Sequence, residues 1–198
     1  MDISIYKLKK QFQNLLMPLC KMFANLGISP NQITIFTIIL NIIFAFILYK
    51  FASFKLIYLL IPFFFLIRMA LNALDGMLAS NFNMKTKVGV FLNETGDIIS
   101  DTVVFYVFFK IINSSEYLAV SFIFLSILTE YIGVVAFMVD GKRHYEGPMG
   151  KSDRVFFISI LSILIYFNFY LFIDYLLIIG LILLIFTIFN RLKNSLRT

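Results

Sequence analysis

The 198-residue chain has one cysteine, no tryptophan and few charged residues. With Cys20 alone, no disulfide can form within the chain and no cysteine-based zinc site is present, so this side chain is expected to act as a small apolar filler. Charged residues make up only 14% of the chain, whereas hydrophobic residues make up 61%. This balance excludes an ordinary soluble domain, in which about half of the residues are apolar.

The mean hydropathy of +0.92 indicates a membrane protein. The 25 phenylalanines are distributed through this apolar background and do not mark an aromatic binding surface. A net charge of +6 would also suit a nucleic-acid-binding protein, but the basic residues lie between apolar runs and at the two ends of the chain. No nucleic-acid-binding motif accompanies them, so no nucleic-acid partner is expected.

Apolar runs long enough to cross a bilayer follow one another along the chain. A bilayer core requires about 20 apolar residues per helix, and four runs meet this length: 32–51, 56–74, 88–112 and 117–139. The apolar stretch 155–190 would measure ~54 Å as one helix against a core of ~30 Å, so we expect two helices with a turn between Asn168 and Asp174. We predict an all-α integral membrane protein, a single domain over 1–198, with an amphipathic interfacial helix within 1–25 and a six-helix transmembrane bundle over 32–190.

Lysine and arginine residues divide unequally between the two sides of this arrangement. Thirteen of the 17 lie on the side that carries both termini, three (Lys50, Lys55 and Lys110) lie on the other, and Arg68 lies inside the second span. Because cytoplasmic loops carry the excess of positive charge, both termini and the loops 80–87 and 140–153 are expected in the cytoplasm. The predicted location is therefore the cytoplasmic (inner) membrane, with multiple crossings.

Polar residues recur at helical spacing in the second and third predicted spans. Asn72 and Asp75 are three residues apart, and Asn93, Asp97 and Asp101 are spaced four residues apart. Each set therefore occupies one face of its helix. Two such faces, joined by a short loop, can form an oxygen-rich pocket suited to Mg²⁺ or Mn²⁺, and a cation there can neutralise a pyrophosphate.

These positions resemble the signature of the CDP-alcohol phosphotransferase family, which reads D-x-x-D-G-x-x-A-R-x8-G-x-x-x-D-x-x-x-D. The sequence reproduces every spacing of the signature, with the residues Asn72, Asp75, Gly76, Ala79, Ser80, Gly89, Asn93 and Asp97. The segment 27–34 is also similar to the residues that precede the family's first membrane helix. Together with the six predicted spans and the surface helix, the resemblance covers nearly the whole chain.

Three positions depart from the signature. Asn72 and Asn93 replace aspartates, and Ser80 replaces an arginine. An asparagine carbonyl can still bind a hard cation, but the loss of two negative charges should weaken metal binding or leave one ion where the family holds more. Asp101, one turn beyond Asp97 on the same face, is a candidate for restoring the missing charge. The pattern is typical of a divergent branch of the family.

The resemblance implies an enzyme of phospholipid biosynthesis that transfers a phosphatidyl group from a CDP-alcohol, expected to be CDP-diacylglycerol, to an alcohol acceptor and releases CMP. It implies a site facing the cytoplasm, an Mg²⁺ or Mn²⁺ cofactor, and a homodimer. Asp97 and Asp75 are the implied catalytic residues. The implied metal ligands are Asn72, Asp75, Asn93 and Asp97, and the implied nucleotide-binding positions are Gly76, Ala79, Ser80 and Gly89.

A second polar cluster precedes the fifth span, over 140–154. Lys151 and Arg154 open that span beside Gly150, and this Gly-Lys step resembles the one in phosphatidylglycerophosphate synthases. Basic residues at a helix N-terminus favour an anion, so we predict that the pair holds a phosphate of the acceptor or of the CDP group, although a purely topological role is an equal alternative. His144 is expected to be an ordinary loop histidine.

Other readings of the same residues stay open. The two asparagines would permit a catalytically weakened homologue that binds nucleotide or lipid without turnover. Arg68 and Glu130 lie within predicted spans and can form a buried ion pair, contribute to the site, or line an ion pathway in a small ion-coupled transporter. The sequence does not name the acceptor alcohol, which can be phosphorylated or not.

Overall fold

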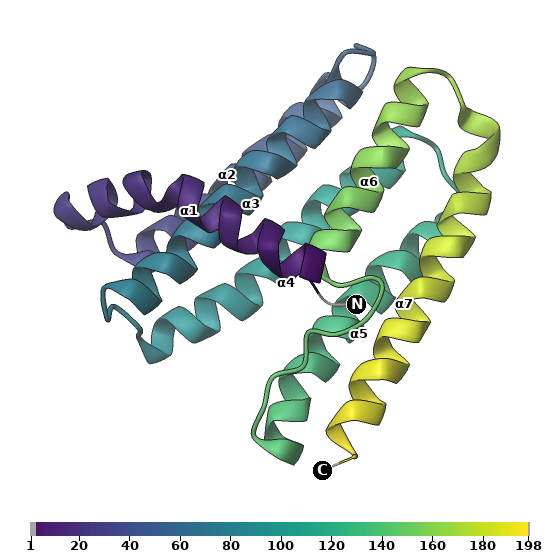
Figure 1. Cartoon of the computed structure of the whole chain (residues 1–198). Helices are drawn as coiled ribbons and strands as arrows, with labels where there is room; N and C mark the ends of the chain where they lie inside the picture. The colour runs from purple at the N-terminus through teal and green to yellow at the C-terminus, as the bar shows by residue number, and fades with distance from the viewer. Residues whose placement is uncertain (1–2, 198) are drawn as a thin grey trace. The chain divides into compact units, whose positions relative to one another are not determined.

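The computed structural model describes residues 3–197, with side chains from Lys10 onward. These residues form α-helices and one short 3-10 helix, η1, and include no strand (Figure 1). The elements are α1 (Ile3–Asn25), α2 (Pro30–Lys50), α3 (Ile57–Asn81), α4 (Lys87–Ile111), α5 (Glu116–Asp140), α6 (Lys151–Tyr166), η1 (Tyr170–Phe172) and α7 (Ile173–Ser195).

The long apolar stretch 155–190 is divided between two helices, as predicted. α6 ends at Tyr166 and α7 begins at Ile173. Asn168 lies between them with φ 66°, a left-handed backbone conformation that asparagine tolerates better than most residues. A chain reversal at this point keeps each helix close to the length of a bilayer core.

Four elements in the described part of the chain are long and apolar enough to cross a membrane. They are α2, α3, α5 and the segment Tyr170–Ser195, which contains η1 and α7. α4 has the length, but it carries Glu94, Asp97 and Asp101, and α6 has only 16 residues. The all-helical fold and these four candidate spans agree with the sequence, while the full count of six crossings stays a prediction.

The chain divides into two compact units. The first unit comprises Met1–Leu40 and Leu66–Asp97. Its core joins α1, α2 and α3 through buried side chains: Cys20, Ile33, Leu74, Met77 and Leu78. Cys20 is fully buried in this cluster, which confirms the expected filler role. Because Met77 and Leu78 pack here, α3 continues to Asn81, seven residues beyond the predicted end at Leu74.

The second unit comprises Asn41–Phe65 and Ile98–Thr198. Within it, α5 and α7 lie against each other (Figure 1). Phe122 of α5 packs against Phe157 of α6, with ring centroids 5.7 Å apart, and edge-on against Phe105 and Phe109 of α4. Gly180 lets α7 approach these rings, since a Cβ there would lie 3.0 Å from Phe157. Aromatic packing therefore joins α4, α5 and α6.

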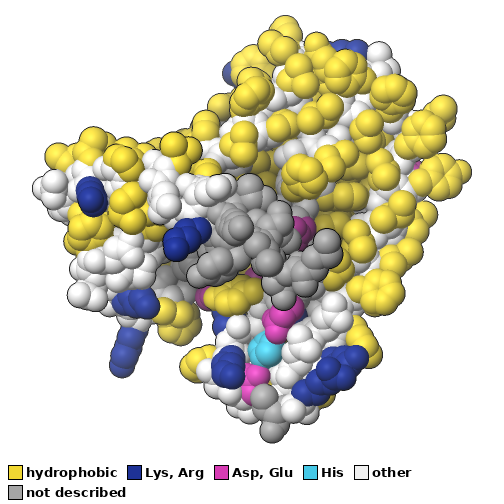
Figure 2. Space-filling view, viewed as in Figure 1, with side chains coloured by type: hydrophobic (Ala, Val, Ile, Leu, Met, Phe, Trp, Pro, Cys, Tyr) yellow, Lys and Arg dark blue, Asp and Glu magenta, His cyan; other side chains and the backbone are white. Residues whose placement is uncertain are grey.

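The surface of the second unit is strongly apolar. Figure 2 shows hydrophobic side chains over α7, whereas charged side chains gather at the end of this unit that carries the C-terminus. On α7 the exposed apolar residues recur at helical spacing: Ile178, Ile182, Ile185, Phe186 and Phe189. Such a surface would be costly in water and is stable in contact with lipid.

The loop 141–150 folds back onto the helices of this unit at Gly133. A Cβ on Gly133 would lie 2.6 Å from the backbone oxygen of His144 and 3.0 Å from Nη1 of Arg191. We predict that Gly133→Ala destabilises the protein by about 1–3 kcal/mol, because the loop backbone must shift to admit the methyl group. Thermal unfolding in detergent measures the effect.

Gly76→Ala is the matched control, since a Cβ on Gly76 of α3 would meet no atom within 4 Å. Its melting temperature should equal or exceed that of the wild type, because alanine favours a helix over glycine. Equal melting temperatures for the two variants would contradict the close contact at Gly133.

Candidate active site

The signature residues of α3 lie in the first unit, and Asp75 is the most buried of them. Asp75 is only 6% exposed. Thr34 of α2 donates a hydrogen bond from Oγ1 to Oδ2 of Asp75, at 2.9 Å. This bond fixes the orientation of the carboxylate and ties α3 to α2.

The beginning of α4 is also attached to α2. Thr86 caps the N-terminus of α4, because its Oγ1 accepts a hydrogen bond from the backbone N–H of Gly89 at 2.9 Å. The side-chain amide of Asn31 donates to the same Thr86 oxygen at 3.2 Å. A Cβ on Gly89 would lie 2.6 Å from Oδ1 of Asn31, so the glycine permits this close approach.

Further along α4, Gly96 rests on α2. A Cβ there would lie 2.6 Å from Cδ1 of Ile38 and 3.8 Å from Cγ2 of Thr34. Thr34 therefore lies near Gly96 of α4 as well as bonding Asp75 of α3, and Asp97 is the next residue along α4. The structure thus brings the two halves of the predicted signature together around α2.

The remaining signature positions differ in exposure. Asn72, Ala79, Asn93 and Asp97 are half-buried. Gly76 is exposed and borders open space, as its missing contacts show. Ser80 is also exposed, and its hydroxyl donates back to the carbonyl of Gly76 at 2.7 Å. Where the family pattern has a long cation, this chain therefore has a hydroxyl bonded to its own helix.

The donor set fits a divalent cation by its chemistry. It consists of two carboxylates, Asp75 and Asp97, and two amide oxygens, Asn72 and Asn93, all of the hard oxygen type that Mg²⁺ and Mn²⁺ prefer. Within residues 3–197, no group of three or more His, Cys, Asp or Glu side chains is placed to hold a metal. The site is therefore poorer in charge than the family pattern.

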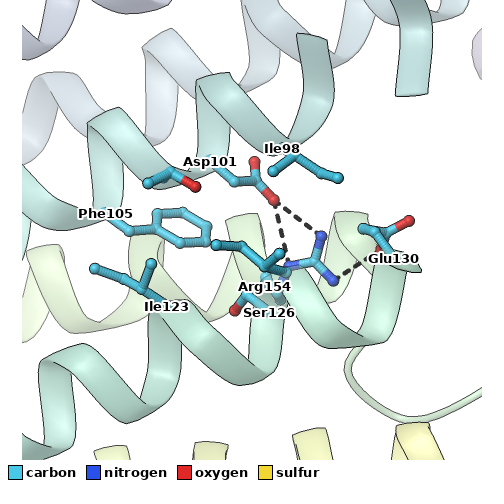
Figure 3. Close-up of a pocket in the computed structure, with 9 residues that line it drawn as sticks. Ile98, Asp101, Phe105, Ile123, Ser126, Glu130 and Arg154 are labelled. Atoms are coloured by element: carbon cyan, nitrogen blue, oxygen red, sulfur yellow. Dashed lines mark hydrogen bonds and ion pairs between the residues drawn. The ribbon is translucent and has the colours of Figure 1, made fainter. Parts of the chain in front are cut away.

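A second polar centre lies in the second unit, around Arg154 of α6 (Figure 3). Its guanidinium is 1% exposed and binds Oδ2 of Asp101 through Nε at 3.3 Å and Nη2 at 2.9 Å. Nη1 donates to Thr129 at 3.1 Å and to Glu130 at 3.0 Å. The predicted compensating acid, Asp101, thus bonds a buried cation, and this ion pair competes with any role at a metal.

Glu130 of α5 is the centre of this cluster. Beside Arg154, its carboxylate binds Nη2 of Arg143 at 2.9 Å and lies 3.6 Å from Nη1 of Arg191. The sequence alone indicates Glu130 as an intramembrane acid with Arg68 as a candidate partner. In the structure, the arginines paired with Glu130 are Arg143, Arg154 and Arg191 instead. Arg143 and Arg191 were assigned only to the positive-inside excess, because nothing in their spacing indicates a shared carboxylate.

The predicted anion-binding pair at the start of α6 has two different environments. Lys151 is half-buried in the first turn, whereas Arg154 points into the interior with its donors engaged. A phosphate that used Arg154 would have to displace a carboxylate.

Two residues that position the signature helices, Thr34 and Asn31, could not be recognised as site residues from the sequence alone. The only signal was their place in the segment 27–34, which resembles the family.

His144 lies in the loop 141–150 between two carboxylates. Nδ1 is 2.6 Å from Oε1 of Glu146 and Nε2 is 2.6 Å from Oδ2 of Asp140. These hydrogen bonds raise the pKa of His144 above its ordinary value of 6.5, while burial opposes the change. The imidazole donates from both nitrogens when it is protonated, so its charge holds the loop together.

Comparison with known proteins agrees with this arrangement of helices. Residues 27–189 match the model of a family described as CDP-alcohol phosphatidyltransferase. The match begins where the segment 27–34 begins and includes both signature helices. The chain belongs to this family.

One relative of this family member matches nearly its whole length. The inner membrane protein YnbA of Escherichia coli (strain K12) is 37% identical over 196 residues, which are 98% of this chain and 97% of YnbA. With the four apolar helices, this likeness supports an integral membrane protein.

Solved structures share the fold. The crystal structure of Mycobacterium tuberculosis phosphatidylinositol phosphate synthase (PgsA1) with CDP-DAG bound has a TM-score of 0.74 and 20% identity, and the match covers 93% of this chain and 94% of PgsA1. The same enzyme with manganese and citrate gives a TM-score of 0.71 at 21% identity, over 91% of this chain and 88% of that one.

The environment of His144 generates a prediction about pH. Because the folded-state pKa is raised, the stabilisation is present below pH ~6.5 and is lost as the pH rises through the folded-state pKa. Wild-type protein should therefore melt at lower temperature above that pKa. In His144→Gln the melting temperature should be lower near pH 6, and the difference from wild type should shrink at high pH.

Melting curves in one detergent across this pH range provide the measurement. Lys193→Gln, which removes an exposed cation of α7, is the control and should shift the curve equally at every pH. If the melting temperatures of the wild type and of His144→Gln differed by the same amount at every pH, this result would contradict a protonated His144.

Proposed function

We propose that the protein transfers a phosphatidyl group from CDP-diacylglycerol to an alcohol and releases CMP, as a step of phospholipid biosynthesis. The observation that carries the proposal is the signature, reproduced at every spacing from Asn72 to Asp97 inside the family match and drawn together around Thr34. The CDP-DAG in the structurally similar PgsA1 supports the choice of donor.

In the proposed reaction, the acceptor hydroxyl oxygen bonds to the phosphorus that carries diacylglycerol. The bond from this phosphorus to the oxygen bridging toward cytidine breaks, and CMP leaves with the electron pair. Asp97 takes the hydroxyl proton on its carboxylate, for which its half-buried position is suited. Gly76 gives the nucleotide room beside α3, and Gly89, which lies against Asn31, is the proposed nucleotide-binding position on α4.

Asp75, Asn72, Asn93 and Asp97 are the proposed ligands of Mg²⁺ or Mn²⁺. A cation bound there would offset the charge of the pyrophosphate and of the departing CMP. The hydrogen bond from Thr34 keeps Asp75 in one orientation before substrate arrives. The manganese present in a PgsA1 crystal structure supports a divalent cation.

Other parts of the proposal concern the setting of the reaction. Both termini and the active site face the cytoplasm, in accord with the lysine and arginine distribution. The protein is a single-domain homodimer of the inner membrane. Ala79 and Ser80 border the nucleotide, and the start of α6, at Lys151 and Arg154, receives the acceptor.

A binding protein without turnover is the second candidate. Asn72 and Asn93 favour it, since they remove two negative charges from the metal site and no cluster of three acidic, histidine or cysteine ligands occurs among residues 3–197. Such a homologue would bind CDP-diacylglycerol and release no CMP. Release of CMP by purified protein, with Mn²⁺ and a panel of alcohols, separates the two functions.

We predict that Asp75→Ala and Asp97→Ala each reduce Mn²⁺-dependent CMP release by about 100-fold or more, because each removes a charged ligand or the general base. Both variants should still insert and purify. The control is Asp174→Ala, which removes an exposed carboxylate at the start of α7 and should keep full activity. Wild-type rates in both site variants would refute the assignment.

Asn72→Asp is predicted to strengthen Mn²⁺ binding, by about 10-fold, because it restores a charged oxygen at a proposed ligand position. Calorimetric titration of the detergent-purified variant measures the affinity. Asn168→Asp, at an exposed position between α6 and η1 in the second unit, adds the same charge away from the signature and should leave Mn²⁺ affinity unchanged. Unchanged or weaker binding in Asn72→Asp would show that Asn72 is not a ligand.

A further inference from the structure

Three helix connections of the second unit meet at one end of it. Nζ of Lys110, in the last turn of α4, lies 5.2 Å from the ring centroid of Tyr49 on α2. Nζ of Lys55, between α2 and α3, lies 5.4 Å from the ring centroid of Tyr166 at the end of α6. Figure 1 shows the connection from α6 to α7 at the end of this unit away from the C-terminus. We call this region the lysine end and define it by the residues 49–56, 110–117 and 166–172.

The lysine end exposes a continuous run of apolar side chains. Every residue of the connection 167–172 is exposed, and five of the six are Phe, Tyr or Leu. Phe54 and Tyr117, on the other two segments, are exposed as well. By contrast, Tyr145 is the one large apolar side chain exposed in the loop 141–150. A run of this kind is unfavourable in water, which indicates that another apolar phase covers it.

The backbone of these connections is hydrogen-bonded within the unit. The three N–H groups of 167–169 donate to carbonyls of the last turn of α6. In the connection from α2 to α3, Phe54 donates to the carbonyl of Phe51 at 2.9 Å. In the connection from α4 to α5, Ser114 donates to the carbonyl of Phe109 at 3.4 Å. Backbone groups that are paired in this way can lie where water is scarce, as at the edge of a bilayer.

Each lysine of the lysine end lies beside an aromatic ring. In addition to the two pairs above, Nζ of Lys50 is 5.9 Å from the ring centroid of Phe51. An ammonium group within about 6 Å of a centroid is attracted to the face of the ring. All three lysines are exposed, and Glu116 is the one acid in the three segments. The net positive charge complements lipid phosphates, which long lysine side chains reach from an apolar surface.

The exposed apolar surface of α7 continues into the lysine end. Phe172, Tyr175, Ile178 and Ile182 are exposed and recur at helical spacing from η1 into α7. Figure 2 shows hydrophobic side chains over the end of this unit away from the C-terminus, with few Lys or Arg side chains among them. Because lipid covers the apolar face of α7, the same lipid is the natural partner of the surface that continues it.

We propose that the lysine end is a lipid-binding surface, embedded in the interfacial layer of the bilayer that surrounds α7. The exposed side chains of 167–172 contact acyl chains, and Lys50, Lys55 and Lys110 bind phosphates of the same leaflet. Aromatic and lysine side chains are the types that anchor a protein at this depth. The inference goes beyond the proposed transferase and does not depend on turnover of a CDP-alcohol.

A single introduced tryptophan tests this position, because the chain has no tryptophan of its own. Phe169→Trp is placed in phospholipid nanodiscs and compared with two references, Phe186→Trp on the exposed face of α7 and Tyr145→Trp in the loop 141–150. Lipids brominated on their acyl chains should quench Phe169→Trp at least about 2-fold more than Tyr145→Trp, as they should quench Phe186→Trp. The emission of Phe169→Trp should also lie at shorter wavelength than that of Tyr145→Trp.

Two results would overturn the inference. If acrylamide in the water quenches Phe169→Trp and brominated lipid quenches it no more than Tyr145→Trp, the connection lies in water. If neither quencher reaches it, protein covers the connection, for example a second copy of this chain. Leu171→Trp, at an exposed position of the same connection, provides the same reading should Phe169→Trp fail to fold.

The combined variant Lys55→Gln and Lys110→Gln tests the phosphate contacts. Loss of the ring contacts lowers the melting temperature to the same extent in phospholipid nanodiscs and in a maltoside detergent, whose head group has no phosphate. Loss of the phosphate contacts should lower it by about 2–4 °C more in the nanodiscs. An equal decrease in both media would show that these lysines serve the rings alone and would overturn the assignment of phosphate binding.

Discussion

Charge pairing inside apolar helices is the constraint on which the second unit depends. Asp101, Glu130 and Arg154 belong to three successive helices, α4, α5 and α6, and each of these side chains is at most 7% exposed. Removing one of them would leave a charge without compensation in a low-dielectric interior, at a cost of about 3–5 kcal/mol. The cluster therefore fixes how these helices meet, and Arg191 extends it to α7 and to the loop 141–150. The same pairs weaken the case for an ion pathway, since a conducting carboxylate must exchange partners readily.

The first unit is organised by contact with α2. Thr34 binds Asp75 and lies near Gly96, while Asn31 is bonded to the Thr86 cap of α4 and lies against Gly89. Small residues at these crossings allow the helices to approach, so the polar faces of α3 and α4 are held by helix packing as well as by any ligand. A site positioned in this way can keep its geometry after aspartate becomes asparagine. This explains how the chain retains the family's framework with fewer charges.

Helix positions followed well from the sequence because each apolar run has the length of a bilayer core. The division of 155–190 was correct, for a single helix of that length would not fit. The end of α3 was placed too early, since the polar and small residues after Leu74 hide the packing of Met77 and Leu78 onto Cys20. α4 and α6 form as predicted, yet their charge and length leave them outside the set of clear membrane spans.

The sequence by itself determined the membrane class, the helices and the signature from Asn72 to Asp97, because composition and spacing along one helix are local properties. It also placed Asp75 and Asp97 on faces that could meet. Only the tertiary structure decided that Thr34 orients Asp75, that Asp101 neutralises Arg154, and that Glu130 binds three arginines. These partners are 41, 53, 13, 24 and 61 residues apart and mostly on different helices. At such separations the pairing depends on which faces the helices turn toward each other, which the spacing of charges along the chain does not specify.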